Sequence, residues 1–309
     1  MGAGLAAKEQ GELRLTLDIV RGFGFEASHD TTQGLSASGQ VTTVPAHRHD
    51  VGLDVTRLEI GAQYAVDDDW DLWLRVPYDI KERRASISLI DPATPSEQAD
   101  MQRNLELHHG TDTLHGFGDA NILVAHSLSG LFAAEDLATV AFGASVPTGR
   151  TEDDPFVAGA EGRSHEHIQF GNGTFDPLLE LYYSNRLSSR FGGTLFGFAR
   201  VPLYKNDHDY RGAPEVTVGG LISYTTTSWL TLRAGLSGFY QGYAYWDGAR
   251  DINTGLLTSA ALIGGELSVG SGVFVSLNVT VPMSQQTLSD SGDTFEQGPL
   301  LSLTTSYSF

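Results

Sequence analysis

The last eleven residues, Pro299–Phe309, alternate strictly between two kinds of side chain, and this alternation limits how the chain can fold. Successive side chains of an extended strand point to opposite faces. One face therefore carries Leu301, Leu303, Tyr307 and Phe309, and the other carries mostly serine and threonine. A strand of this kind is typical of the closing strand of an outer-membrane β-barrel, whose apolar face contacts lipid and whose polar face lines a wet lumen. The final strand of a soluble β-sandwich would alternate in the same way, so this segment alone leaves both folds open.

The lengths of the connections favour the barrel. The alternating pattern recurs in about twelve segments, and long polar connections alternate with short ones along the chain. Long connections are expected at 26–49, 82–115, 148–172, 205–214, 241–255 and 284–298. Outer-membrane barrels have short periplasmic turns and long extracellular loops, whereas a sandwich spaces its turns more evenly. The sequence therefore predicts an all-β fold: one transmembrane antiparallel β-barrel of about 12 strands over residues 11–309, preceded by a periplasmic N-terminal segment at 1–10.

Composition excludes several classes of protein. No apolar run approaches the roughly 20 residues that a membrane-spanning helix needs. The absence of cysteine excludes disulfides and thiolate metal sites, and the net charge of −19 argues against nucleic acid as a partner.

The segment Met1–Lys8 lacks the features of an export signal. We therefore expect a mature protein in the outer membrane of a Gram-negative bacterium, with the signal already removed. The expected partners are lipid and a small-molecule solute, with a surface protein or a second copy as further candidates.

The alternation also predicts which side chains face the lumen. The candidates for the lumen wall or a constriction are Arg14, Asp18, Glu59, Arg75, Asp79, Asp119, Glu180, Phe196, Phe198, Arg233 and Glu266. Charges of both signs are expected inside any water-filled barrel, where cross-strand pairs hold its shape. The same charges could instead form a constriction that selects solutes. The sequence leaves both interpretations open for each of these residues.

Histidines gather in the predicted outer loops. Nine of the ten, including His29, fall there, and His126 falls in a strand. Imidazole and carboxylate groups at short spacing can bind a divalent ion such as Zn²⁺, Cu²⁺ or Ca²⁺. The candidate ligands are His47, His49, His108, His109, His115, His165, His167, Asp207, His208 and Asp209. The alternative is that histidine is simply a common residue of polar loops, and no resident cofactor is otherwise expected.

An enzymatic function is not expected. Some outer-membrane barrels are hydrolases that use serine with histidine, and His126-Ser127 is the pair of this kind in a predicted strand. Adjacent strand residues point to opposite faces, so this pair cannot form the hydrogen bond that activates a nucleophile. The chain also lacks a Gly-x-Ser-x-Gly elbow and a phosphate-binding Walker motif.

Five short segments resemble an outer-membrane family named for the meta-pathway of phenol degradation. They are Val76–Tyr78 (VPY), Gly116–Leu123 (GFGDANIL), Val146–Gly149 (VPTG), Gly171–Asp176 (GNGTFD) and Asp209–Gly212 (DYRG). Together they span about half of the chain, and they mark strand ends and loop entries. The resemblance implies a barrel that acts as a channel or transporter for small, often aromatic, hydrophobic compounds. It supplies no site residues, and histidine-rich loops are not a feature that we associate with the family.

Two functions therefore follow from the sequence. The first is a channel or transporter-like barrel for passive passage of small solutes, aromatic or cationic. The alternative is a non-conducting structural or interaction barrel, whose acidic, histidine-rich extracellular loops bind metal ions or a surface partner. Conductance across a planar bilayer distinguishes the two.

Overall fold

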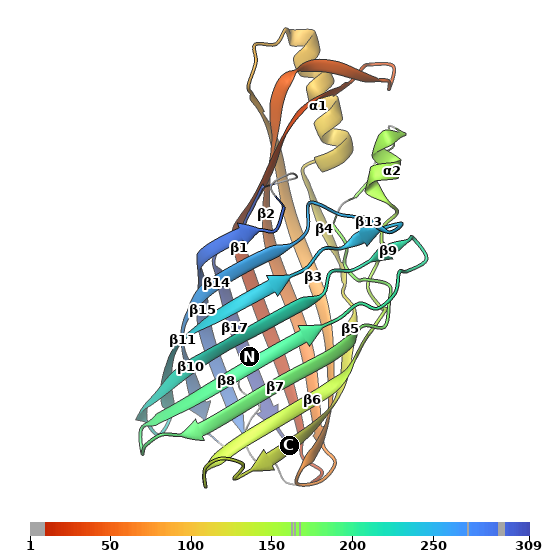
Figure 1. The fold of residues 1–309 in the computed structure, drawn as a ribbon. Helices are drawn as coiled ribbons and strands as arrows, with labels where there is room; N and C mark the ends of the chain where they lie inside the picture. Colours follow the sequence, from red (N-terminus) through yellow and green to blue (C-terminus); the bar gives the residue numbers. More distant parts are fainter. Residues whose placement is uncertain (1–9, 162, 164, 167, 271, 290–293) are drawn as a thin grey trace.

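The fold is a closed antiparallel β-barrel (Figure 1). The computed structural model describes residues 10–161, 163, 165, 166, 168–270, 272–289 and 294–309. The periplasmic segment expected at 1–10 falls almost wholly outside the described residues. Twelve strands of the described chain form the barrel wall: β1 (Leu13–Leu35), β2 (Val41–Ala65), β3 (Trp70–Leu89), β5 (Ala120–Ser129), β6 (Asp136–Val146), β7 (Pro177–Arg186), β8 (Phe191–Arg200), β10 (Glu215–Thr227), β11 (Leu230–Gln241), β14 (Leu256–Val269), β15 (Val273–Thr287) and β17 (Leu300–Ser308).

Closure joins the first strand to the last. Each barrel strand pairs with its neighbour in sequence, and β1 pairs with both β2 and β17. Arg14 lies opposite Ser308, so β1 begins and β17 ends at the same end of the barrel. The short connections, such as 66–69 and 187–190, lie at this short-turn end, and the other connections lie at the opposite, long-loop end. The predicted barrel and its alternation of connection lengths are confirmed.

The outer face of the wall is apolar, as contact with lipid requires. On β3, the side chains of Leu72 and Leu74 are 47% and 43% exposed, whereas Trp73 between them is 4% exposed. On β17, Tyr307 is exposed and the hydroxyls of Thr304 and Ser306 are buried. A period of two therefore separates a lipid face from an interior face within the barrel wall.

The first long connection was expected to be a loop at 26–49, and this expectation is wrong. β1 and β2 continue through it as a hairpin, with a tip at 36–40. β1, β2 and β3 have 23, 25 and 20 residues, although about 9–11 residues suffice to cross a bilayer. From His29 to Leu35, β1 pairs with β2 and with no other described strand. The extra length projects beyond the barrel (Figure 1), where no lipid imposes an apolar face, so the pattern by which strands were recognised is lost.

A helix lies inside the second predicted loop. α1 (Pro95–His109) begins with a capping box, in which the Thr94 hydroxyl accepts from the Glu97 amide and the Glu97 carboxylate accepts from the Thr94 amide. Its side chains Met101 and Leu105 are buried against the hairpin, and the Arg103 Nε donates to the Leu35 carbonyl at 2.8 Å. We call α1, together with β1 from residue 29, β2 up to residue 50 and β3 from residue 84, the hairpin extension.

The other long connections carry short elements at the same end. These are β4 (Asp112–Phe117), α2 (Pro155–Ala160), β9 (Tyr210–Arg211), β12 (Tyr245–Trp246), β13 (Ala249–Arg250) and β16 (Thr294–Glu296). β4 and β16 extend the pairing of β3 and β1, whereas β9, β12 and β13 form a separate small sheet. No helix in the described part of the chain is long and apolar enough to cross a membrane.

Candidate functional site

An ion pair crosses the barrel interior. The Arg75 guanidinium on β3 donates to both carboxylate oxygens of Glu180 on β7, at 2.6 and 2.9 Å. Two further strands, β5 and β6, separate β3 from β7 in the wall. The ion pair therefore spans the inner face of β5 and β6 and does not join two adjacent, hydrogen-bonded strands. The Tyr182 hydroxyl donates to the same carboxylate at 2.8 Å.

Aromatic rings surround this ion pair. Trp73 lies edge-on to Tyr182 with ring centroids 6.1 Å apart, and the Arg75 guanidinium lies 5.3 Å from the Trp73 ring. On the other side, Tyr182 contacts Phe198 at 5.4 Å, and Phe198 stacks on Phe196 at 5.5 Å. We call Trp73, Arg75, Glu180, Tyr182, Phe196 and Phe198 the lumen cluster. It combines two opposite charges with four aromatic faces.

Two other interior ion pairs involve predicted lumen residues. Asp79 is 1% exposed and accepts from both ends of the Arg57 guanidinium, at 2.7 and 2.8 Å. Arg233 on β11 pairs with Glu266 on β14. Both pairs join adjacent strands, so they brace the wall.

Three more candidates lie on the strands that close the barrel. Arg14 donates to the Ser308 hydroxyl at 3.0 Å, which ties the start of β1 to the end of β17. Asp18 accepts from the Thr304 hydroxyl, and Glu59 lies opposite Asp18 in the β1–β2 register. The structure thus distributes these groups along one seam and does not bring them into the lumen cluster.

Asp119 lies at the long-loop rim of the barrel, between β4 and β5. It is 4% exposed, and its two carboxylate oxygens accept from the backbone amides of Gly149 at 3.0 Å and Asn172 at 2.7 Å. The Asp119 carboxylate therefore holds the backbone at Gly149 and at Asn172 against the rim of the barrel.

The five segments on which the family resemblance rests meet around Asp119. The Gly118 amide donates to the Pro77 carbonyl at 3.0 Å, and the Thr148 hydroxyl donates to the Gly118 carbonyl at 2.9 Å. A Cβ at Gly171 would lie 2.2 Å from the Asp119 Oδ1, and a Cβ at Gly212 would lie 2.5 Å from the Asn172 Nδ2. We call this contact of Pro77, Gly118, Asp119, Thr148, Gly149, Gly171, Asn172 and Gly212 the rim knot. Its glycines permit the close approach of neighbouring groups.

Six histidines meet in and beside the hairpin extension. His29 and His49 are direct register partners on β1 and β2, and His109 ends α1. Ring centroids lie 5.0 Å apart for His29 and His49, 5.3 Å for His29 and His109, and 5.9 Å for His49 and His109. Around these three lie His47, with its ring 5.1 Å from that of His49, and a pair, His108 and His165, whose Nδ1 and Nε2 are 3.0 Å apart.

Burial keeps two imidazoles of this cluster, His49 and His108, neutral. His49 is 1% exposed and His47 is fully buried. Burial and the neighbouring imidazoles lower the pKa of His49 to about 3. Burial and the contact with His165 lower the pKa of His108 to about 4. His49 and His108 are therefore uncharged at neutral pH, and neutral imidazole is the form that binds metal ions.

The remaining candidate ligands lie elsewhere. His115 shares a hydrogen bond with the Tyr78 hydroxyl at 2.9 Å, and the His208 Nδ1 lies 2.8 Å from a carboxylate oxygen of Asp153. Asp209 pairs with Lys205, Asp207 is exposed, and His167 lies outside the described residues. His29 was missing from the predicted ligands. Its position opposite His49 could have been found only by assuming a hairpin across the supposed loop.

The strand histidine has a packing role. The His126 ring stacks on Trp70 with centroids 4.3 Å apart. The Ser127 hydroxyl is hydrogen-bonded to the Thr139 hydroxyl at 3.0 Å.

Comparison with known proteins gives matches in structure and none in sequence. No protein-family model matches the chain, and no curated protein matches it. The structure is similar to the crystal structure of the COG4313 outer membrane channel from Pseudomonas putida F1, with a TM-score of 0.61, 13% identity, and coverage of 100% of this chain and 99% of that one. The P. putida toluene transporter TodX gives a TM-score of 0.40 at 12% identity, covering 98% and 90%. A Pseudomonas aeruginosa FadL homologue gives 0.41 at 10% identity, covering 96% and 90%. The first of these likenesses shows that this chain has the fold of an outer-membrane β-barrel.

Proposed function

We propose that the protein is an outer-membrane channel through which small solutes, aromatic ones in particular, pass by passive diffusion. The observation that carries this proposal is the lumen cluster. A solute that crosses the barrel at the level of Arg75 and Glu180 meets two mutually neutralised charges and the faces of Tyr182, Phe196 and Phe198.

The chemistry of the cluster favours aromatic solutes. Aromatic rings attract one another in edge-on and offset arrangements beyond the effect of buried area, and they attract organic cations through their faces. Because Arg75 and Glu180 neutralise each other, the cluster adds no net charge that would repel either kind of ion. The sequence resemblance to the phenol meta-pathway family supports the same class of solute.

The orientation follows from the usual topology of such barrels. Outer-membrane barrels carry long loops outside and short turns in the periplasm. The hairpin extension and the rim knot then face the exterior, and a solute enters past them.

Bilayer conductance tests the proposal. The refolded protein is inserted into planar bilayers, and reversal potentials are measured for benzylammonium against butylammonium, an aliphatic cation of the same charge. We expect steady openings and a preference for the aromatic cation. A silent bilayer, together with no flux of either compound into liposomes, would contradict the proposal and favour the non-conducting barrel.

A further inference from the structure

We propose that His29, His49 and His109 bind one divalent transition-metal ion, of the Zn²⁺, Ni²⁺ or Cu²⁺ class, within the hairpin extension. The ligand atoms of these three side chains all lie within 4.8 Å of one another. The inference does not depend on whether the barrel conducts.

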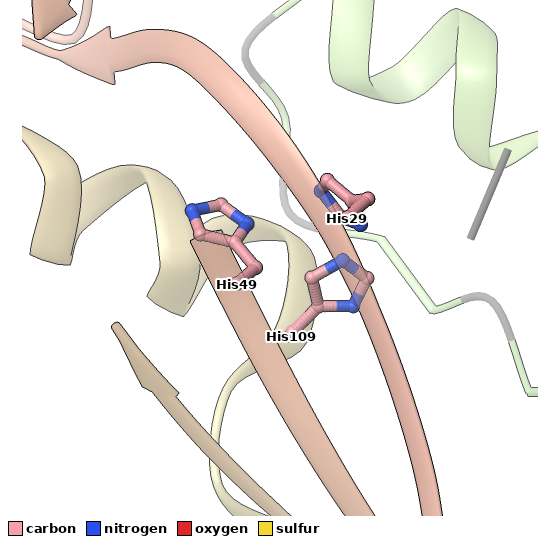
Figure 2. Close-up of side chains that lie close together, drawn as sticks. All are labelled: His29, His49 and His109. Atoms are coloured by element: carbon pink, nitrogen blue, oxygen red, sulfur yellow. The ribbon is translucent and has the colours of Figure 1, made fainter. Parts of the chain in front are cut away.

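The fold brings the three ligands together from three elements. His29 and His49 share one rung of the β1–β2 hairpin, and α1 ends at His109 beside that rung. Figure 2 shows the three side chains close together, with the two strands and the end of the helix around them. A tetrahedral zinc ion with Zn–N distances of about 2.0–2.1 Å would place its nitrogens roughly 3.3 Å apart. The His29 and His109 side chains are half-buried, and their rotation can shorten the distances between the ligand nitrogens to this value.

The buried ring of His49 provides a second observation. It is 1% exposed, and neither of its ring nitrogens has a hydrogen-bond partner. Buried polar groups of native proteins are nearly always satisfied. Here a buried ring with two unsatisfied nitrogens lies beside two further imidazoles, and a bound cation would satisfy the nitrogen that carries the lone pair.

The donor set identifies the class of ion. Among the described residues, the group whose ligand atoms lie within 4.8 Å of one another contains three imidazoles and no carboxylate. The nearest acids along the strands are engaged elsewhere, Asp30 with Arg48 at 2.7 Å and Asp50 with the Ser88 hydroxyl at 2.6 Å. Imidazole nitrogens suit zinc, copper and nickel, whereas calcium takes oxygen ligands. Three histidines also leave a fourth position for water or for a neighbouring imidazole such as His47.

Metal binding would join α1 to the hairpin. His109 is the last residue of α1, and the other two ligands lie on β1 and β2, so one ion would connect all three elements. The ion would thereby fix the hairpin extension at the long-loop end of the barrel.

Direct binding to the metal-free full-length protein tests the site. The protein is prepared without a polyhistidine tag, treated with chelator, and titrated with Zn²⁺ by calorimetry and with Co²⁺ by visible absorption. We expect one equivalent to bind. His29→Gln and His109→Gln should each weaken binding by more than about a hundredfold, because loss of a direct ligand exceeds the 10–100-fold effect of losing a supporting group. The matched control is His208→Gln, which changes a loop histidine paired with Asp153 and should leave the affinity within about twofold.

Folding of each variant is checked by circular dichroism and by the migration of the unheated barrel on gels. Unchanged affinity in folded His29→Gln and His109→Gln protein, or no saturable binding to the wild-type protein, would overturn the site. A conducting barrel that binds no zinc would leave the proposed channel intact, and a silent barrel that binds zinc would leave the site intact.

Discussion

Arg75 on β3 and Glu180 on β7 form a two-point ion pair even though β5 and β6 lie between their strands. The side chains are 22% and 10% exposed, so the pair is largely removed from bulk water. The contact therefore braces the barrel from inside, and it also brings Tyr182 and Trp73 into one group.

Removing one member of this pair should cost more than removing both. Glu180→Ala leaves the Arg75 charge in the interior without its main partner, and we expect a loss of about 3 kcal/mol in the free energy of unfolding. The double variant Arg75→Ala/Glu180→Ala should recover part of that loss. Urea unfolding in lipid vesicles measures both. The control is Glu135→Ala, which breaks the exposed 3.7 Å pair with Arg186 and should cost about 0–1 kcal/mol. Equal losses in the single and double variants would contradict the expected coupling.

The aromatic side of the lumen cluster should set solute preference. Phe198→Leu removes a ring that contacts both Tyr182 and Phe196. We expect the benzylammonium-to-butylammonium permeability ratio to fall several-fold, with potassium conductance changed by less than about twofold, because only the aromatic solute loses a ring contact. Phe191→Leu on the same strand is the control, since Phe191 is 47% exposed on the outer face. An equal fall in both variants would exclude a specific role for the lumen ring.

Close contact in the rim knot should make Gly171 intolerant of a side chain. A Cβ there would lie 2.2 Å from the Asp119 Oδ1, so Gly171→Ala must displace the carboxylate from the Gly149 and Asn172 amides. We expect destabilisation of about 2 kcal/mol or more from the lost charge-assisted bonds. Hydrogen exchange should show early opening of the loops after β4 and β6. Gly197→Ala is the control, because its Cβ would meet nothing closer than 3.8 Å. The same protection pattern in both variants would count against the knot.

The capping box should control the stability of α1. Thr94→Ala removes the hydroxyl that accepts from the Glu97 amide, at a cost of about 1 kcal/mol for the helix. Hydrogen exchange should report faster opening of the first turn of α1, with the barrel strands unchanged. Ser96→Ala should have little effect, since its hydroxyl contacts the Thr94 hydroxyl rather than a helix amide. Faster exchange throughout the barrel would show that α1 is not an independent unit.

Zinc should protect the same helix at its other end. We assume that opening of the hairpin extension destroys the His29–His49–His109 site. Free Zn²⁺ at 100 times its dissociation constant should then raise the free energy of that opening by about 2.7 kcal/mol, and amide exchange in the extension should slow accordingly. The protected amides should lie in the last turn of α1 and near His29 and His49. The β10–β11 turn serves as an internal reference and should not change. Protection that survives in His109→Gln protein would contradict this linkage.

The barrel could be predicted from the amino-acid pattern without knowledge of the fold. Lipid on one side and water on the other impose a period of two on every strand that crosses the membrane, and this period is a local property of segments such as Pro299–Phe309. The count of alternating segments then predicted the number of strands, and the alternation of short and long connections predicted the two ends of the barrel. The same reasoning failed at residues 26–49 and 82–115. There the chain has left the membrane, so the hairpin has no lipid face, and α1 buries too few apolar residues to show a clear period.

The residues that make up each site could be identified only from the folded chain. Contacts between inward-facing side chains depend on the register of the strands and on how the barrel closes. The alternation within one strand predicts neither of these. Arg75 and Glu180 are 105 residues apart, and the segments of the rim knot come from five separate places in the chain. His29 joined the histidine cluster because pairing set it opposite His49, and His109 joined because α1 folded back onto that hairpin. The period of the sequence predicts whether a side chain faces lipid or water. It does not predict which side chain from a distant part of the chain lies next to it, and a site depends on that contact.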